Sequence, residues 1–151
     1  MSRISHEEFR TKLMSAEEAV QFINPGDNVG FSGFTGAGYP KLVPGALAER
    51  IKAAHDRGEK FQIGMWTGAS TAPELDGALA EVDGISFRTP YQSDPMMRKR
   101  INAGDTGYAD IHLSHMAPMV RSEFLGHLNV AVVEVTAIDD EGNLIPSSSM
   151  G

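Results

Sequence analysis

Hydrophobic residues along this chain follow two alternating patterns. Short apolar or β-branched runs at 29–32, 61–66, 85–88 and 130–133 have the length of β-strands, whereas residues 44–56 carry apolar side chains at helical spacing. The run at 130–133 has the composition of a buried parallel strand. Strands that alternate with helices predict an α/β fold, with a parallel open sheet and helices on both faces.

Local capping signals place further helices. Ser15 and Glu18 have the spacing of a capping box, before a helix that Asn24-Pro25-Gly26 ends. Pro73 suits the first turn of a short helix, and Asp94-Pro95 suits the start of another. The remaining predicted features are a helix stop at Gly104, a helix at 117–124, strands at 110–113 and 144–145, and a turn at 139–143.

A glycine-rich loop follows the first strand, with Gly33, Gly36 and Gly38 within six residues. Glycine permits positive φ and lets a ligand approach the backbone, so the N–H groups of this loop suit an anion. Pro40 and Pro44 then favour a helix start, and the helix N-terminus would add to such a site. The spacing fits neither a dinucleotide fingerprint nor a P-loop, so an ordinary strand-to-helix turn is an equal alternative.

A second segment of small and hydroxyl residues, Thr67-Gly68-Ala69-Ser70-Thr71, follows the strand at 61–66 and is predicted to be a loop. Such a segment before a helix is typical of an oxyanion-binding site, although a helix cap by Ser70 or Thr71 is the simpler interpretation. The serines after Pro146 form another polar segment. Because the carboxyl ends of parallel strands meet at one edge of a sheet, we expect these segments to line one crevice.

Other polar groups give weaker indications. Arg98, Lys99 and Arg100 are consecutive in a predicted helix, so their side chains diverge and indicate a solvated or inter-subunit surface. His112 and His115 lack a third ligand at a recognisable spacing, and no metal site is predicted. The following carboxylates qualify as a base or nucleophile only if they are buried: Glu74, Asp76, Glu81 and Glu134.

Length and composition narrow the class of protein. At 151 residues the chain is predicted to form one domain, 13–151, after a polar arm at 1–12 that is mobile unless it docks. The formal net charge of −7 argues against nucleic acid or an anionic membrane surface as a partner. The chain has no cysteine, no apolar run of membrane-spanning length and no signal-peptide pattern, so a cytoplasmic location is expected.

Several blocks of the sequence together resemble one protein family. They are Gly33-Phe34-Thr35-Gly36-Ala37-Gly38-Tyr39-Pro40-Lys41, Thr67-Gly68-Ala69-Ser70-Thr71, Met97-Arg98 through Arg100-Ile101-Asn102-Ala103-Gly104, and Pro146-Ser147-Ser148-Ser149. In this order they look like the amino-terminal domain of the acetyl-CoA hydrolase/transferase family, most of all its succinyl-CoA:acetate CoA-transferases. The resemblance implies a CoA-transferase-type α/β domain in a protein of two such domains, with this chain ending before the second.

The resemblance also implies a ping-pong reaction through a glutamyl-CoA thioester, with coenzyme A as a substrate and no permanently bound cofactor. The glutamate nucleophile would lie in the second domain, so this chain would contribute no catalytic residue and would be inactive alone. It would bind acyl-CoA and a short carboxylate, acetate or succinate, within a homodimer. The motif match assigns substrate binding to Gly33, Phe34, Thr35, Gly36, Ala37, Gly38, Gly68, Ala69, Ser70 and Thr71, with the Ser70 hydroxyl on the substrate and Thr71 supporting it.

Two alternatives stay open at this point. A sugar-phosphate isomerase on the same fold would use these loops for a phosphate group. It would also need a carboxylate base and a lysine, and Lys41 is the only lysine of the loop. The other alternative is a non-catalytic binding module or a fragment.

Overall fold

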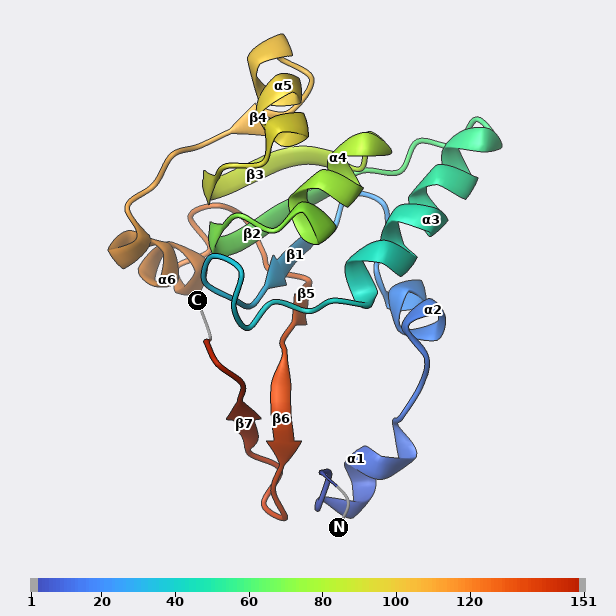
Figure 1. Ribbon diagram of the computed structural model, residues 1–151, viewed down its shortest axis with the longest axis vertical. Helices are drawn as coiled ribbons and strands as arrows, with labels where there is room; N and C mark the ends of the chain where they lie inside the picture. Colours follow the sequence, from blue (N-terminus) through green and yellow to red (C-terminus); the bar gives the residue numbers. More distant parts are fainter. Residues whose placement is uncertain (1–2, 150–151) are drawn as a thin grey trace.

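The computed structural model describes residues 3–149. Within this range a five-stranded sheet has the order β4-β3-β2-β1-β5, and neighbouring strands run parallel (Figure 1). The strands are β1 (Asn28–Phe31), β2 (Ile63–Ser70), β3 (Ile85–Gln92), β4 (Gly107–Tyr108) and β5 (Val130–Val132). The predicted parallel open sheet is therefore confirmed.

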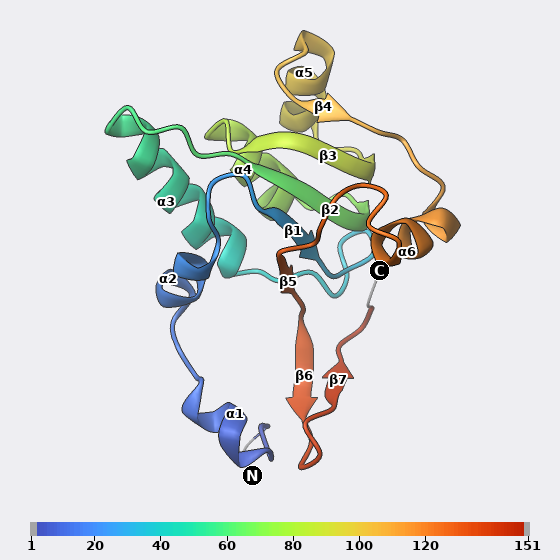
Figure 2. The same cartoon turned by 180° about the vertical axis from the view of Figure 1, so that it is seen from behind.

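Helices lie on both faces of this sheet, as predicted. One face carries α2 (Ala16–Ala19) with a following 3-10 turn (Val20–Phe22), α3 (Val43–Asp56), a π-helical turn (Pro73–Gly77) with α4 (Ala78–Glu81), and α5 (Pro95–Ala103) (Figure 1). The opposite face carries α6 (Leu113–Arg121) (Figure 2). Residues of α6 line a pocket there together with Gly30 and Trp66. Among the described residues, no helix is both long and apolar enough to cross a lipid bilayer.

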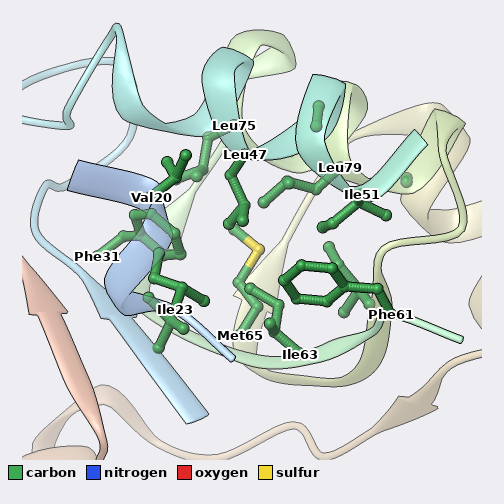
Figure 3. Close-up of a cluster of buried hydrophobic side chains, with 14 of the residues drawn as sticks. Val20, Ile23, Phe31, Leu47, Ile51, Phe61, Ile63, Met65, Leu75 and Leu79 are labelled. Carbon is green, nitrogen blue, oxygen red and sulfur yellow. The ribbon is translucent and has the colours of Figure 1, made fainter. Parts of the chain in front are cut away.

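The hydrophobic core lies between the sheet and the layer formed by α3 and α4. Val29 and Phe31 of β1 are buried in it, and the two-residue repeat of a strand directs Gly30 to the other face. Figure 3 shows helical side chains packed over those of the strands, among them Leu47, Ile51, Leu75, Leu79, Phe31, Ile63 and Met65. This packing fixes the positions at which β1 and β2 end.

The predicted helix caps are present. The hydroxyl of Ser15 accepts from the backbone N–H of Glu18 at 3.2 Å, and the Glu18 carboxylate accepts from the Ser15 N–H at 2.8 Å. Asp94 caps α5 by accepting from the backbone N–H of Met96 at 2.8 Å. Gly104 ends that helix at a φ of +82°, a left-handed conformation that favours glycine.

A two-stranded antiparallel hairpin projects from the sheet. It consists of β6 (Val135–Ile138) and β7 (Leu144–Pro146), so the strand predicted at 144–145 exists but lies outside the main sheet (Figure 1). The amino-terminal segment docks on this hairpin and carries a short helix, α1 (Glu7–Thr11). The N–H of Ser5 donates to the carbonyl of Ile138 at 2.8 Å, so the polar arm is held by the hairpin, apart from residues 1 and 2, which lie outside the described range.

Some predicted boundaries were wrong. The segment predicted as a loop at 67–71 is strand as far as Ser70, because β2 continues through an irregularity in its pairing with β3. No strand forms at 110–113, and α6 begins there, at Leu113, one turn before the predicted start. The strand at 130–133 is half-exposed rather than buried, because β5 is an edge strand of the sheet.

Candidate functional site

The glycine loop, residues 32–42, joins β1 to α3. Phe34 and Ala37 exchange backbone hydrogen bonds, from the Phe34 N–H to the Ala37 carbonyl at 2.9 Å and in the reverse direction at 3.1 Å. These bonds close a tight turn with Thr35 and Gly36 at its tip, and Thr35 has a φ of +54°. The loop is therefore a narrow hairpin that projects from the end of β1, rather than an open ring of N–H groups around a helix N-terminus.

The tip of the glycine loop pairs with the end of β2. The Thr35 N–H donates to the carbonyl of Ala69 at 2.6 Å, and Thr35 forms a parallel bridge with Ser70. The structure thus brings together the two segments that the sequence singled out. Phe34, Thr35 and Gly36 are exposed at this junction, so a ligand can reach it.

The glycines of the loop serve different purposes. A Cβ on Gly33, at a φ of +117°, would lie 2.8 Å from the Tyr39 nitrogen, and one on Gly38 would overlap the carbonyl oxygen of Ser149. Both positions are required by close packing of the chain on itself. A Cβ on Gly36 would have nothing within 4 Å. Only Gly36 therefore leaves open space where a ligand can approach the backbone. The Ser149 contact also places the third predicted segment against the loop.

Ser70 is buried, and its hydroxyl donates to the carboxylate of Asp76. Asp76 also accepts from the Nε of Arg88 at 2.7 Å, and neither member of this ion pair has an exposed side chain. The remaining guanidinium nitrogens of Arg88 donate to backbone carbonyls, including that of Tyr91 at 3.1 Å. The group that supports Ser70 is thus Asp76, whereas Thr71, predicted to support it, is exposed.

Asp76 and Arg88 are site residues that sequence reasoning did not single out for this role. Asp76 was one of several carboxylates that only burial could distinguish, and Arg88 appeared as the last residue of a strand. A buried arginine must pair with an acceptor, because leaving its charge unpaired would be costly. The pairing follows from the tertiary fold and carries no local sequence signal.

A second ion pair borders the loop on the side of β5. Lys41 Nζ lies 2.6 Å from the Glu134 carboxylate, which also accepts from the Ser147 hydroxyl at 2.8 Å. The hydrogen bond from Lys41, followed by that from Ser147, lowers the pKa of the Glu134 carboxyl below its usual value. Glu134 is therefore an ionised, engaged group.

A largely apolar pocket of about 580 Å³ opens between α6 and the sheet. Trp66, Met116, Val120 and Leu128 contribute its apolar wall, and Phe34 and Gly68 border it where β2 approaches the glycine loop. A smaller cleft of about 430 Å³ lies next to Ala69, between Tyr91 and His112. Both hollows adjoin the junction of the loop with β2, so this edge of the sheet can hold a ligand with an apolar part and a polar end.

The other polar groups form no comparable site. The rings of His112 and His115 lie 5.9 Å apart, and within residues 3–149 no three acidic, histidine or cysteine side chains gather as a metal site requires. Arg100 pairs with Asp83, whereas Arg98 and Lys99 are exposed. The three cations of α5 thus diverge, as their consecutive spacing predicts.

Comparison with known proteins gives a consistent result. The family model described as "Acetyl-CoA hydrolase/transferase N-terminal domain" matches residues 1–151. The chain is 40% identical to the succinyl-CoA:acetate CoA-transferase of Clostridium kluyveri over 149 residues, 99% of this chain and 27% of that protein. It is 41% identical to the propanoyl-CoA:succinate CoA transferase of Escherichia coli, over 91% of this chain and 28% of that protein. It is 35% identical to the acetyl-CoA hydrolase of Schizosaccharomyces pombe, over 99% of this chain and 30% of that protein.

The fold also has a counterpart among solved structures. RipA from Yersinia pestis superposes with a TM-score of 0.55 at 24% sequence identity, over 78% of this chain and 28% of RipA. At this identity the likeness concerns the fold alone. The chain thus spans between 27% and 30% of the length of these curated relatives. Since the family model matches the chain from its first residue to its last, this chain belongs to the acetyl-CoA hydrolase/transferase family and corresponds to its N-terminal domain.

Proposed function

We propose that this chain forms the acyl- and carboxylate-binding part of an acyl-CoA:carboxylate CoA-transferase or acetyl-CoA hydrolase. Coenzyme A enters as part of the substrate, and acetate or succinate is the carboxylate. The names of the relatives support this assignment. One relative is a succinyl-CoA:acetate CoA-transferase, another is a propanoyl-CoA:succinate CoA transferase, and a third is an acetyl-CoA hydrolase.

The observation that carries the proposal is the junction of Thr35 with Ala69 and Ser70. It joins the glycine loop to the end of β2 at the edge of the sheet where α/β proteins bind ligands. Gly36 has open space beside its Cα at the tip of this junction. We assign the small polar end of the substrate, a carboxylate or the acyl oxygen, to this tip.

The apolar pocket beneath α6 supplies the second half of the site. Its wall of Trp66, Met116 and Leu128 suits the hydrocarbon part of an acyl group or of the pantetheine arm. The pocket reaches Phe34 and Gly68, so an apolar chain bound there would have its polar end beside the glycine loop.

We place the covalent step on a glutamate outside the described residues. Attack of that carboxylate on the acyl-CoA would expel the CoA thiolate and leave an acyl-glutamyl anhydride. Return of the thiolate would then form glutamyl-CoA and release the carboxylate. Three carboxylates close to the glycine loop are engaged: Asp76 with Arg88, Glu134 with Lys41, and Glu74 with the hydroxyl of Tyr39 at 3.1 Å. The pairing of Lys41 also argues against the isomerase alternative, which needs that amine free.

A pair of glycine variants in the complete protein tests the assignment. Gly36 and Gly45 both have open space around a Cβ, and Gly45 lies on α3 away from the junction with β2. We expect Gly36→Val to lower kcat/KM about tenfold or more by blocking the tip, and Gly45→Val to stay near wild type. Equal activity of the two variants would refute the site. Wild-type protein that is stabilised against heat by a sugar phosphate, but not by a short acyl-CoA, would refute the substrate class.

We also propose that the complete protein is a homodimer. The half-exposed edge strand β5 and the exposed side chains of Phe22 and Leu42 support this, because unpaired edges and apolar surface favour association. Light scattering on the complete protein tests it, and a monomeric mass would contradict it.

A further inference from the structure

Glu134 occupies the short connection between β5 and β6, where the sheet gives way to the projecting hairpin. Each carboxylate oxygen has its own donor, Lys41 Nζ at 2.6 Å on one and the Ser147 hydroxyl at 2.8 Å on the other. The backbone N–H of Glu134 donates to the hydroxyl oxygen of Ser32 at 2.9 Å. One residue therefore contacts both ends of the glycine loop and the segment that follows β7.

The contacts of Glu134 continue into the loop itself. The Ser32 hydroxyl, which accepts from Glu134, donates in turn to the carbonyl of Gly38 at 2.8 Å and so closes the base of the loop. Lys41 donates to the carbonyl of Tyr39 at 3.0 Å, and its Nζ lies 4.5 Å from the centre of the Tyr39 ring. The loop is thus held at Ser32 and Gly38 and again at Tyr39 and Lys41.

This arrangement differs from an ordinary surface ion pair. The Glu134 side chain is 26% exposed and that of Lys41 is 56% exposed, and the two residues lie 93 positions apart in the sequence. The pair between Lys52 and Asp56 on α3 is a contrast, because both side chains are more than half exposed and they are four residues apart on one helix. The difference therefore lies in Glu134, whose partly buried carboxylate is screened less by solvent than the exposed carboxylate of Asp56.

We propose that Glu134 is a positioning residue, which holds the glycine loop against β2 in the conformation that binds the small carboxylate of the substrate. The inference rests on the proposed function of the loop. Without the Glu134 carboxylate, Lys41 and Ser147 lose their shared acceptor, and the Thr35 and Gly36 tip is free to leave Ala69. The small carboxylate then binds more weakly, while the chemical step on the rest of the protein is unchanged.

The contacts of Glu134 with Ser32, Lys41 and Ser147 form a clamp on the glycine loop, and hydrogen exchange of the complete protein tests this clamp without reference to activity. Glu134→Gln keeps the shape of the side chain and removes its charge, and Asp56→Asn does the same for the pair on α3. We expect Glu134→Gln to speed exchange of the Thr35 and Ala37 amides about tenfold and Asp56→Asn to leave them unchanged. Unchanged exchange in Glu134→Gln, or an equal increase across β1 and β2, would overturn the proposal.

Kinetics of the complete protein then test the consequence. We expect Glu134→Gln to raise KM for the carboxylate about tenfold, with kcat within about twofold of wild type, and Asp56→Asn to change neither. The exchanged pair Lys41→Glu with Glu134→Lys should restore part of the lost affinity. A wild-type KM in an active Glu134→Gln enzyme would overturn the positioning role. Absence of turnover in the wild type would instead refute the proposed function, and the exchange experiment would still decide whether the clamp exists.

Discussion

The hydroxyl of Ser70 donates a hydrogen bond to Asp76, a side chain with no exposed surface that follows it by six residues. The bond joins the last residue of β2 to the π-helical turn after it, and Arg88 on β3 donates to the same carboxylate. The end of β2 is thereby fixed from within the protein. Contact between Ser70 and a substrate carboxylate would require its hydroxyl to turn away from Asp76.

Removing this hydroxyl is expected to destabilise the fold. Ser70→Ala leaves a buried carboxylate oxygen without its donor, so the free energy of unfolding should fall by about 1–3 kcal/mol, as measured by urea denaturation. Thr71→Ala is the control, since Thr71 is exposed and its loss should cost about 0.5 kcal/mol or less. Equal urea midpoints for the two variants would contradict a structural role for Ser70. If the midpoints are equal and Ser70→Ala lowers kcat/KM of the complete enzyme, the role of Ser70 is to bind the substrate and not to stabilise the fold.

The buried ion pair should show strong coupling. Arg88→Met leaves the buried charge of Asp76 without a partner, so we expect a loss of about 3–5 kcal/mol in the free energy of unfolding. Combining it with Asp76→Leu should recover most of that loss, because no buried charge then remains. A double-mutant cycle on urea midpoints measures the coupling, and strictly additive losses would show that the two side chains act independently.

The contact between Glu134 and Lys41 should weaken in acid. The pKa of Glu134 is lowered in the folded protein, by Lys41 and then by Ser147. Its contribution to stability is therefore complete above the unfolded-state pKa of about 4.3 and is lost as the pH falls through the lower folded-state value.

The measurement is the difference in urea midpoint between wild type and Glu134→Gln. We expect this difference to shrink as the pH falls from about 6 to about 3. The subtraction removes the effect of other acidic groups with lowered pKa values, such as Asp139. A difference that stays constant over this range would contradict an ionised Glu134 in the folded state.

The isolated 151-residue chain is expected to show no thioester cleavage. Three carboxylates near the glycine loop, Asp76, Glu134 and Glu74, are held by Arg88, Lys41 and Tyr39, so none of these three is free to attack an acyl group. Thiol release from acetyl-CoA, followed with a colorimetric thiol reagent, measures this. Release above a protein-free control, abolished by Glu134→Gln, would place a nucleophile in this chain and contradict our assignment of the covalent step.

Much of the fold follows from local sequence. The strand at 29–32, the capping box at Ser15 and the cap at Asp94 were predicted correctly, because each depends on residues that are neighbours in the chain. Small residues misled the prediction for 67–70, since a strand in the middle of a sheet accepts glycine and serine where its neighbours supply the packing. The helix predicted at 117–124 likewise begins a turn earlier, at Leu113.

The candidate site was only partly predictable. The glycine loop and the end of β2 were identified from their composition, and the rule that parallel strands end at one edge correctly brought them together. The partners that hold them, Asp76, Arg88 and Glu134, depend on burial and on contacts between distant segments. Whether the ten assigned residues contact substrate stays a prediction, for which the experiments above provide the tests.

The sheet order has a consequence for how the chain folds during its synthesis. Strands β1, β2 and β3 are neighbours both in sequence and in the sheet, so they can pair soon after they emerge from the ribosome. The last strand of this sheet to be made, β5, joins at β1, and Glu134 and Ser147 follow it. The glycine loop is synthesised early, but its contacts with Glu134 can form only after nearly the whole chain has been synthesised. A ribosome-bound nascent chain stalled before residue 134 should pair β1, β2 and β3 while its loop is still accessible to protease.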